Sequence, residues 1–215
     1  MKKERRKMLC IAVCMFAAFL LWTIAICLVE VEAIGPQGST VGFATLNKFV
    51  HNLTGVHMQL YVITDWLGLV PLIFVIGFAL LGLVQWIQRK HIGQVDRSIL
   101  ALGGFYVVVM AAYIFFEHVV VNYRPVLING ILEASYPSST TLLVLCVMLT
   151  AIMELRCRIK NPMRNRCVTY TMAVFVAFMV IGRLVSGVHW ITDIIGSVLL
   201  SLSLVALYYA LGHTL

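Results

Sequence analysis

Six apolar runs, each about long enough to cross a lipid bilayer, are the feature that most constrains the fold of this chain. They cover approximately residues 9–29, 61–86, 99–116, 140–155, 168–185 and 194–211. A bilayer's hydrocarbon core is ~30 Å thick and takes ~20 residues of α-helix. Only 12% of the residues are charged, against roughly 25% in soluble domains. The sequence therefore predicts an all-α polytopic integral membrane protein with six transmembrane helices, forming a single domain over residues 1–215.

The first run could be a cleaved signal sequence or a retained span, because five basic residues precede it. It is longer than a typical signal core, and Glu30 and Glu32 follow it in place of a small-residue cleavage site. We interpret it as a retained span. Pro71 falls inside the second run and predicts a kink there.

Lys and Arg residues are distributed unequally between the connecting segments. Thirteen of the sixteen lie before the first run, between the second and third, or between the fourth and fifth. Positive residues accumulate on the cytoplasmic side of membrane proteins, so both termini are predicted to be cytoplasmic in a multi-pass protein of the cell membrane. This placement also explains the net charge of +7 without a nucleic-acid partner. Only Lys48, Arg124 and Arg183 remain for the extracytoplasmic side.

The first extracytoplasmic segment carries apolar residues at helical spacing: Phe43, Leu46, Phe49, Val50 and Leu53. This pattern predicts a helix lying in the membrane interface, opened by Ser39 or Thr40 and closed near Gly55. Its polar residues Lys48, His51 and His57 are expected to face solvent or lipid headgroups.

Three polar stretches fall at the same outer membrane face. They are Asn122-Tyr123-Arg124-Pro125 after the third run, Tyr136-Pro137-Ser138-Ser139-Thr140 before the fourth, and Gly182-Arg183 through His189 to Asp193 between the last two. Two arginines can clamp a phosphate through paired hydrogen bonds. Hydroxyls and amides at a helix start can hold its oxygens. The phosphate-binding candidates are Arg124, Arg183, Ser138 and Ser139.

His189 and Asp193 are four residues apart and share a helix face if the sixth helix begins at His189. A carboxylate bonded to one ring nitrogen would fix the tautomer and leave the other nitrogen as nucleophile or base. A structural pair at a helix start has the same spacing and is the alternative interpretation.

In order and spacing, these stretches resemble the signature of the type 2 phosphatidic acid phosphatase superfamily: K-x(6)-R-P, P-S-G-H and S-R-x(5)-H-x(3)-D on a six-helix core. The resemblance covers nearly the whole chain and implies roles for four residues. His189 would be the nucleophile that forms a phosphohistidine, oriented by Asp193, while Arg124 and Arg183 bind the phosphate. It implies no cofactor and no metal, and it does not indicate an oligomeric state.

Two groups of the signature are replaced, because Glu117 occupies the lysine position and Thr140 the second-motif histidine position. Ser139 replaces the glycine of the second motif and Gly182 the serine of the third, and both replacements are milder than the other two. An ionised Glu117 would repel a phosphate unless it turns away, pairs with an arginine or recruits a divalent cation, and a protonated Glu117 could donate a proton. His118 is a candidate substitute or an ordinary interface histidine.

The loss of the histidine bears on the substrate. In the family that histidine protonates the leaving alkoxide, and losing such an acid typically costs about 10²- to 10⁴-fold. A threonine hydroxyl cannot do this, so a better leaving group is favoured. We therefore expect a membrane lipid phosphatase with its site on the extracytoplasmic side, acting on a lipid phosphate or diphosphate, with polyprenyl diphosphate favoured. The alternatives are a catalytically inactive relative that binds or scaffolds phosphate-headgroup lipids, and a lipid phosphotransferase.

Overall fold

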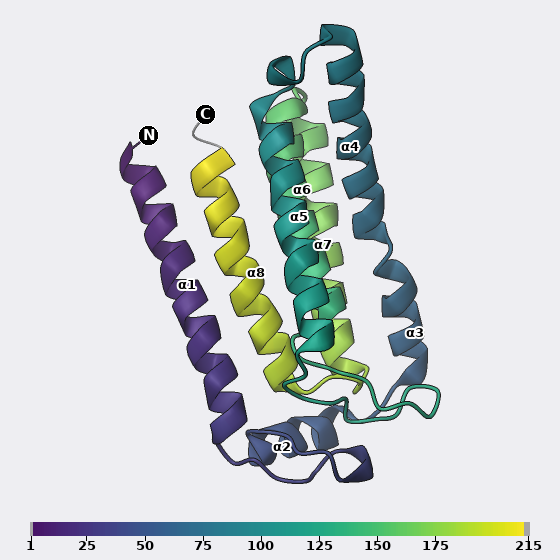
Figure 1. The fold of residues 1–215 in the computed structure, drawn as a ribbon. Coiled ribbons are helices and arrows are strands. Elements are labelled where there is room, and N and C mark those ends of the chain that lie inside the picture. The colour runs from purple at the N-terminus through teal and green to yellow at the C-terminus, as the bar shows by residue number, and fades with distance from the viewer. Residues whose placement is uncertain (1, 213–215) are drawn as a thin grey trace.

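The computed structural model describes residues 2–212, which form a bundle of helices (Figure 1). Six helical spans in this part of the chain are long and apolar enough to cross a membrane, which confirms the predicted number. They are α1 (Lys2–Leu28), α3 with α4 (Met58–Leu67 and Val70–Arg89), α5 (Arg97–His118), α6 (Ser139–Arg158), α7 (Pro162–Val185) and α8 (Ile191–Gly212).

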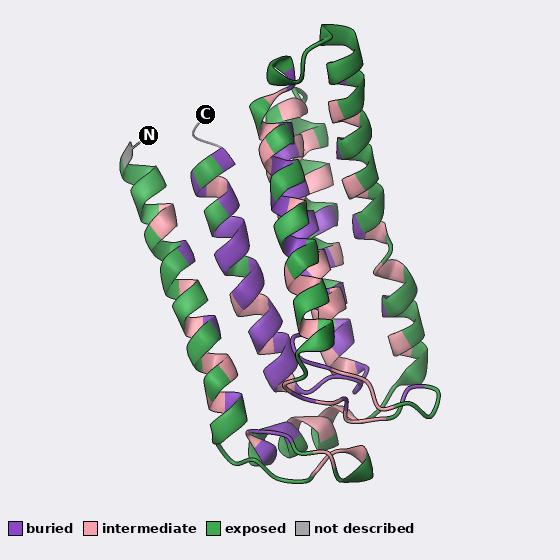
Figure 2. Cartoon of the chain, in the orientation of Figure 1, coloured by how far each residue is buried: buried purple, intermediate pink, exposed green. Residues whose placement is uncertain are grey.

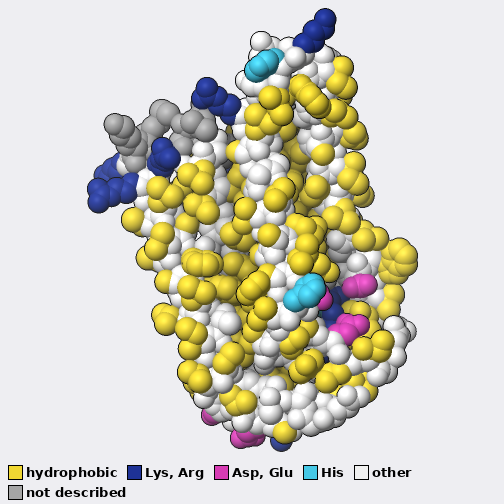
Figure 3. Space-filling model, in the orientation of Figure 1, with side chains coloured by type: hydrophobic (Ala, Val, Ile, Leu, Met, Phe, Trp, Pro, Cys, Tyr) yellow, Lys and Arg dark blue, Asp and Glu magenta, His cyan; other side chains and the backbone are white. Residues whose placement is uncertain are grey.

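Helices α6 and α8 are the most buried spans and form the centre of the bundle. Helix α1 packs along α8, α7 packs on α6, and α5 contacts both central helices. Figure 2 shows the difference, with α8 largely buried and the outward surfaces of α1 and α4 exposed. The exposed side chains of the spans are mainly Leu, Ile, Val and Phe, and Figure 3 shows them along the length of the bundle. Such a surface suits lipid contact.

The second span is broken into two helices. Helix α3 ends at Leu67, α4 starts at Val70, and Pro71 occupies the first turn of α4. Proline is tolerated there because the first amides of a helix have no intrahelical acceptor. The predicted kink therefore occurs, and it separates two packing partners: α3 lies against α7, whereas α4 lies against α5 and α6.

Helix α2 (Ala44–Thr54) lies across the end of the bundle below α8 (Figure 1). Its end near Gly55 agrees with the prediction, but its start at Ser39 or Thr40 was wrong. The residues before it are extended because Val41 pairs with Glu32 in an antiparallel bridge, after a 3-10 turn, η1 (Pro36–Gly38).

One buried asparagine fastens α2 to the start of α8. The Asn47 amide donates to the Gly42 carbonyl at 2.7 Å and to Thr192 Oγ1 at 3.0 Å. On the same helix Lys48 is exposed, whereas the His51 ring packs 5.4 Å from the Trp190 ring, and partial burial lowers the pKa of His51. Helix α2 is therefore tied to the segment that carries the candidate site.

The start of α1 and the end of α8 lie at the same end of the bundle as the α4–α5 and α6–α7 connections (Figure 1). A buried polar network holds the helices together toward this end. Glu154 on α6 is 1% exposed, pairs with Arg158 and accepts a hydrogen bond from the Tyr208 hydroxyl at 2.6 Å. Arg158 also donates to Ser98 Oγ at 3.1 Å. The buried carboxylate is thus fully engaged between α6 and α8.

Candidate active site

A polar cavity of about 680 Å³ lies toward the opposite end of the bundle, beside the segment that joins α5 to α6. Helices α3 to α7 and this segment all contribute to its wall. Its charged lining residues are Asp65, Glu117, Arg124, Glu133 and Arg183. Figure 3 shows the corresponding hollow, where basic atoms are set back between acidic side chains.

Arg183, in the last turn of α7, is only 1% exposed. Its Nη2 lies 3.1 Å from His189 Nε2, and its Nη1 lies 3.5 Å from Asp65 Oδ1. The guanidinium carbon sits 5.1 Å from the centre of the Tyr61 ring. Nε and Nη1 have no hydrogen-bond partner among the described residues. Burial of a guanidinium whose N–H groups lack acceptors costs free energy, unless an anion accepts hydrogen bonds from them.

Arg124 approaches the same tyrosine from the α5–α6 connection. Its backbone amide donates to the Glu133 carbonyl at 3.0 Å, which holds two arms of this segment together. Its side chain is buried, with Nε 3.0 Å from Glu133 Oε2 and the guanidinium carbon 5.9 Å from the Tyr61 ring centre. Nη1 has no hydrogen-bond partner in the described structure. Two arginines with spare donors therefore converge on one cavity.

His189 precedes α8 and lies against Asp193. Its Nδ1 is 3.7 Å from Asp193 Oδ2, and that oxygen also accepts the Trp190 amide at 3.0 Å. Asn122 donates to the other oxygen, Oδ1, at 3.2 Å. Helix α8 begins at Ile191, two residues later than the helix start that the spacing argument assumed. The predicted pair nevertheless meets.

The protonation of His189 follows from its neighbours. A guanidinium can only donate, so Nε2, which faces Arg183, acts as the acceptor and the proton resides on Nδ1. Burial, and then the positive charge of Arg183, holds the pKa of His189 well below its usual value. The arrangement is a neutral imidazole whose Nε2 lone pair faces the Arg183 guanidinium.

The start of α6 completes the wall of the cavity. Ser138 is buried and caps the helix, with its Oγ 3.5 Å from the Thr141 amide. Ser139 and Thr140 line the cavity, whereas Ser138 does not. The N-terminus of this 20-residue helix therefore borders the cavity, where its dipole favours an anion.

The sequence model of the PAP2 superfamily matches residues 73–215. This chain belongs to the PAP2 superfamily. A crystal structure of a transmembrane PAP2-type phosphatidylglycerolphosphate phosphatase from Bacillus subtilis has a similar fold, with a TM-score of 0.58 over 94% of this chain and 95% of that chain, at 18% identity. Comparison with curated proteins gives no match.

The PAP2 match begins inside α4, so it leaves out two residues that contact the arginines. Tyr61 and Asp65 lie one turn apart on α3 and both approach Arg183. Neither residue was predicted from the sequence, nor was Glu133, and Asn122 was placed in the first polar stretch without a role. An aspartate inside an apolar run was the available signal, since charged residues within spans usually serve a site.

The two replaced PAP2 motif positions both border the cavity. Glu117, in the last turn of α5, is exposed and forms no ion pair with a basic residue in the described structure, and Thr140 faces the same space from α6. His118 does not line the cavity, because its Nδ1 lies 2.9 Å from the Ile114 carbonyl on its own helix. Within residues 2–212 no group of three or more His, Cys, Asp or Glu side chains is placed to hold a metal ion.

Two glycines allow the close packing that positions this PAP2 site. A Cβ on Gly182 would lie 2.9 Å from Thr64 Cγ2, so the serine of the family signature does not fit unless the Thr64 side chain or α3 shifts. Gly187 has φ +71° and packs against the Gly55 backbone in the turn that leads to His189. Only glycine adopts this backbone without strain.

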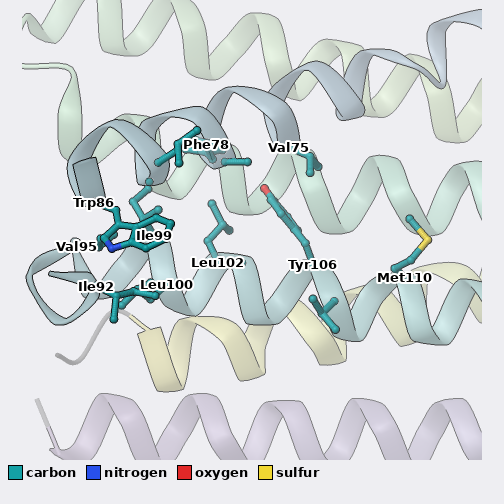
Figure 4. A pocket seen from close by; sticks show the side chains of 15 residues that line it. Val75, Phe78, Trp86, Ile92, Val95, Ile99, Leu100, Leu102, Tyr106 and Met110 are labelled. Carbon is teal, nitrogen blue, oxygen red and sulfur yellow. The ribbon is translucent and has the colours of Figure 1, made fainter. Parts of the chain in front are cut away.

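An apolar cavity of about 520 Å³ lies between α4 and α5 (Figure 4). Val75 and Phe78 on α4 and Leu102, Tyr106 and Met110 on α5 are among its walls (Figure 4). The polar cavity is lined by earlier residues of α4 and later residues of α5. The two cavities therefore follow one another along the same pair of helices.

Proposed function

We propose that this PAP2 protein is an integral membrane phosphatase that hydrolyses a lipid phosphate or diphosphate through a phosphohistidine intermediate. The observation that carries the proposal is the neutral His189, with Nε2 3.1 Å from Arg183, beside buried arginine nitrogens that have no hydrogen-bond partner in the described structure. Phosphoryl transfer depends mainly on in-line positioning and on neutralising charge on the phosphoryl oxygens. Membership of the PAP2 superfamily supports a membrane lipid phosphatase. We assign this function to one domain over residues 1–215.

The proposed first step is attack by His189 Nε2 on the phosphorus. A P–N bond forms, the bond from phosphorus to the leaving oxygen breaks, and that oxygen keeps the electron pair. Asp193, with Oδ2 3.7 Å from Nδ1, faces the Nδ1 proton and stabilises the charge that develops on the ring. Arg124 and Arg183 bind the phosphoryl oxygens. Water then attacks the phosphohistidine, which releases phosphate and restores His189.

We propose polyprenyl diphosphate as the favoured substrate because of its leaving group. The lipid monophosphate leaves from a diphosphate without the acid that Thr140 cannot supply, whereas the alkoxide of a phosphomonoester needs protonation. The apolar cavity between α4 and α5 supports a long-tailed lipid, since it is a separate space that lies farther along the same two helices than the polar cavity. The bilayer itself is the other partner of this surface.

We further propose that both termini are cytoplasmic and that the site lies on the extracytoplasmic side. Thirteen of the sixteen Lys and Arg residues support this orientation, because they lie before the first apolar run or in the segments that join the second run to the third and the fourth to the fifth. The polar cavity lies toward the other end of the bundle.

A catalytically inactive lipid-binding relative is the second candidate. It is favoured by the carboxylates of Asp65 and Glu133, which already lie 3.5 and 3.0 Å from arginine nitrogens and compete with a phosphate for them. Such a protein would bind phosphate headgroups through Arg124 and Arg183 without turnover.

The test is phosphate release by the purified full-length protein in detergent, from a polyprenyl diphosphate and from phosphatidic acid. We expect turnover by the wild type, faster on the diphosphate, unaffected by a chelator, and reduced to background in His189→Ala. His57→Ala is the matched control, because His57 is exposed and outside the lining. Headgroup binding without turnover by the folded wild type would favour the inactive relative. Faster release from phosphatidic acid would contradict the substrate assignment.

A further inference from the structure

Glu117 borders both spaces that meet at the candidate site. One is the polar cavity that contains the arginines, and the other is a narrow cavity that reaches His189. The polar side chains common to both walls are Tyr113, Glu117 and Ser139. A group in this position lies beside a phosphoryl group held between His189 and the arginines.

We propose that Glu117 is the general base that activates water for hydrolysis of the phosphohistidine. The inference rests on the proposed function and assigns the residue that completes its second step. In the first step the lipid diphosphate needs no acid. In the second step water is a weak nucleophile, and a carboxylate that removes its proton accelerates the attack.

No other group in the described wall can take this role. The hydroxyls of Tyr113 and Ser139 do not accept a proton at neutral pH. The carboxylates of Asp65 and Glu133 lie within ion-pair distance of the two arginines, whereas Glu117 forms no such pair among the described residues. The titratable groups around the two cavities are Asp65, Tyr113, Glu117, Tyr123, Arg124, Glu133, Tyr136, Arg183 and His189.

The geometry of in-line transfer fits this position. The lipid monophosphate departs on the side of the phosphorus opposite His189, and water enters from that side. The water oxygen forms a bond to phosphorus, the P–Nε2 bond breaks, and its electron pair returns to His189. Glu117 accepts the water proton and later releases it to solvent. Phosphate is the product, and the enzyme returns to its starting state.

A carboxylate is tolerated beside the phosphoryl group for two reasons. Arg124, Arg183 and the N-terminus of α6 supply positive potential, and the exposure of Glu117 lets solvent screen its repulsion. The two departures from the PAP2 signature then complement each other, one in each step of the reaction. Loss of the histidine at Thr140 restricts the enzyme to groups that leave unaided, and the exchange of lysine for Glu117 supplies the base.

The experiment compares Glu117→Gln with wild type on a polyprenyl diphosphate, with kcat and kcat/KM measured and the phosphohistidine fraction quantified after rapid quenching. We expect kcat to fall about 10²- to 10⁴-fold, without a fall in kcat/KM, because kcat/KM reports only steps up to departure of the lipid monophosphate. Phosphohistidine should accumulate in the steady state. Hydroxylamine, a nucleophile that needs no prior deprotonation, should restore turnover.

Two carboxylates serve as matched controls. Glu133→Gln removes a negative charge from the same cavity and should change KM without accumulation of phosphohistidine. Glu32→Gln removes an exposed carboxylate that does not line the cavity and should change neither constant. Thermal unfolding of each variant shows whether it is folded.

The outcomes separate this inference from the proposed function. An equal fall of kcat and kcat/KM in Glu117→Gln, without accumulation or rescue, would assign Glu117 to the first step or to structure and overturn the inference alone. Unchanged kcat would do the same. A folded wild type that forms no phosphohistidine and releases no phosphate would overturn the proposed function, and the role of Glu117 with it.

Discussion

At the scale of single residues, the site divides into groups that a linear motif reveals and groups that only packing brings in. Arg183, His189 and Asp193 have the family spacing and do converge. Asn122 does not belong to the signature, yet it donates to Asp193 Oδ1 at 3.2 Å from 71 residues away. Such a contact depends on how the α5–α6 connection folds over α8. Periodicity and spacing carry no information on it.

Removal of the Asn122 amide should therefore slow catalysis without removing any reacting group. We expect Asn122→Ala to lower kcat about 10- to 100-fold, by analogy with the loss of the hydrogen-bond partners that orient metal-binding side chains. Asn52→Ala is the control, because Asn52 is exposed on α2. Equal phosphate release by wild type and Asn122→Ala would contradict the assigned orientation of Asp193.

His189 should also make stability depend on pH. Its pKa in the folded protein is well below the ordinary value because of burial and Arg183, so protons bind preferentially to the unfolded chain. Its contribution to stability is present above the unfolded pKa of about 6.5 and falls by up to about 1.4 kcal/mol per pH unit below it. The thermal unfolding temperature should drop more between pH 7.5 and 5 in wild type than in His189→Asn. Parallel curves would contradict this prediction.

At the scale of elements, the helices were predictable and their junctions were not. The apolar runs gave six spans, and Pro71 indicated the break between α3 and α4. The start of α2 was misplaced because the Glu32–Val41 bridge keeps the residues before it extended. That bridge joins residues nine positions apart, and a local pattern such as a helix-capping residue does not reveal it.

The packing of α3 on α7 gives a sharper test at this scale. Gly182→Ser should push against Thr64 Cγ2, displace Tyr61 and Asp65 from Arg183, and cost about 1–3 kcal/mol of stability, as overpacking usually does. Thr64→Ser removes the obstructing methyl group and keeps the hydroxyl that donates to Leu60 at 2.8 Å. The double variant should therefore recover activity and unfolding temperature. If the losses of activity and unfolding temperature add up in the double variant, the contact between position 182 and Thr64 Cγ2 is not their cause.

At the scale of the whole molecule, the unequal distribution of basic residues predicts orientation. In a variant without native cysteines, Lys48→Cys should react with a membrane-impermeant maleimide in intact cells. Lys160→Cys should react only after permeabilisation. Both positions are exposed, so accessibility to solvent does not bias the comparison. The reverse pattern would place the site on the cytoplasmic side.

The central claim is that His189 becomes phosphorylated, and direct detection of that intermediate tests it best. The wild type and Glu117→Gln would be incubated with a polyprenyl diphosphate labelled in its terminal phosphate, quenched in alkali and mapped by peptide mass spectrometry. We expect an acid-labile label on His189, stronger in Glu117→Gln and missing from His189→Ala. Phosphate release by wild type without label on His189, or label that persists in His189→Ala, would contradict it.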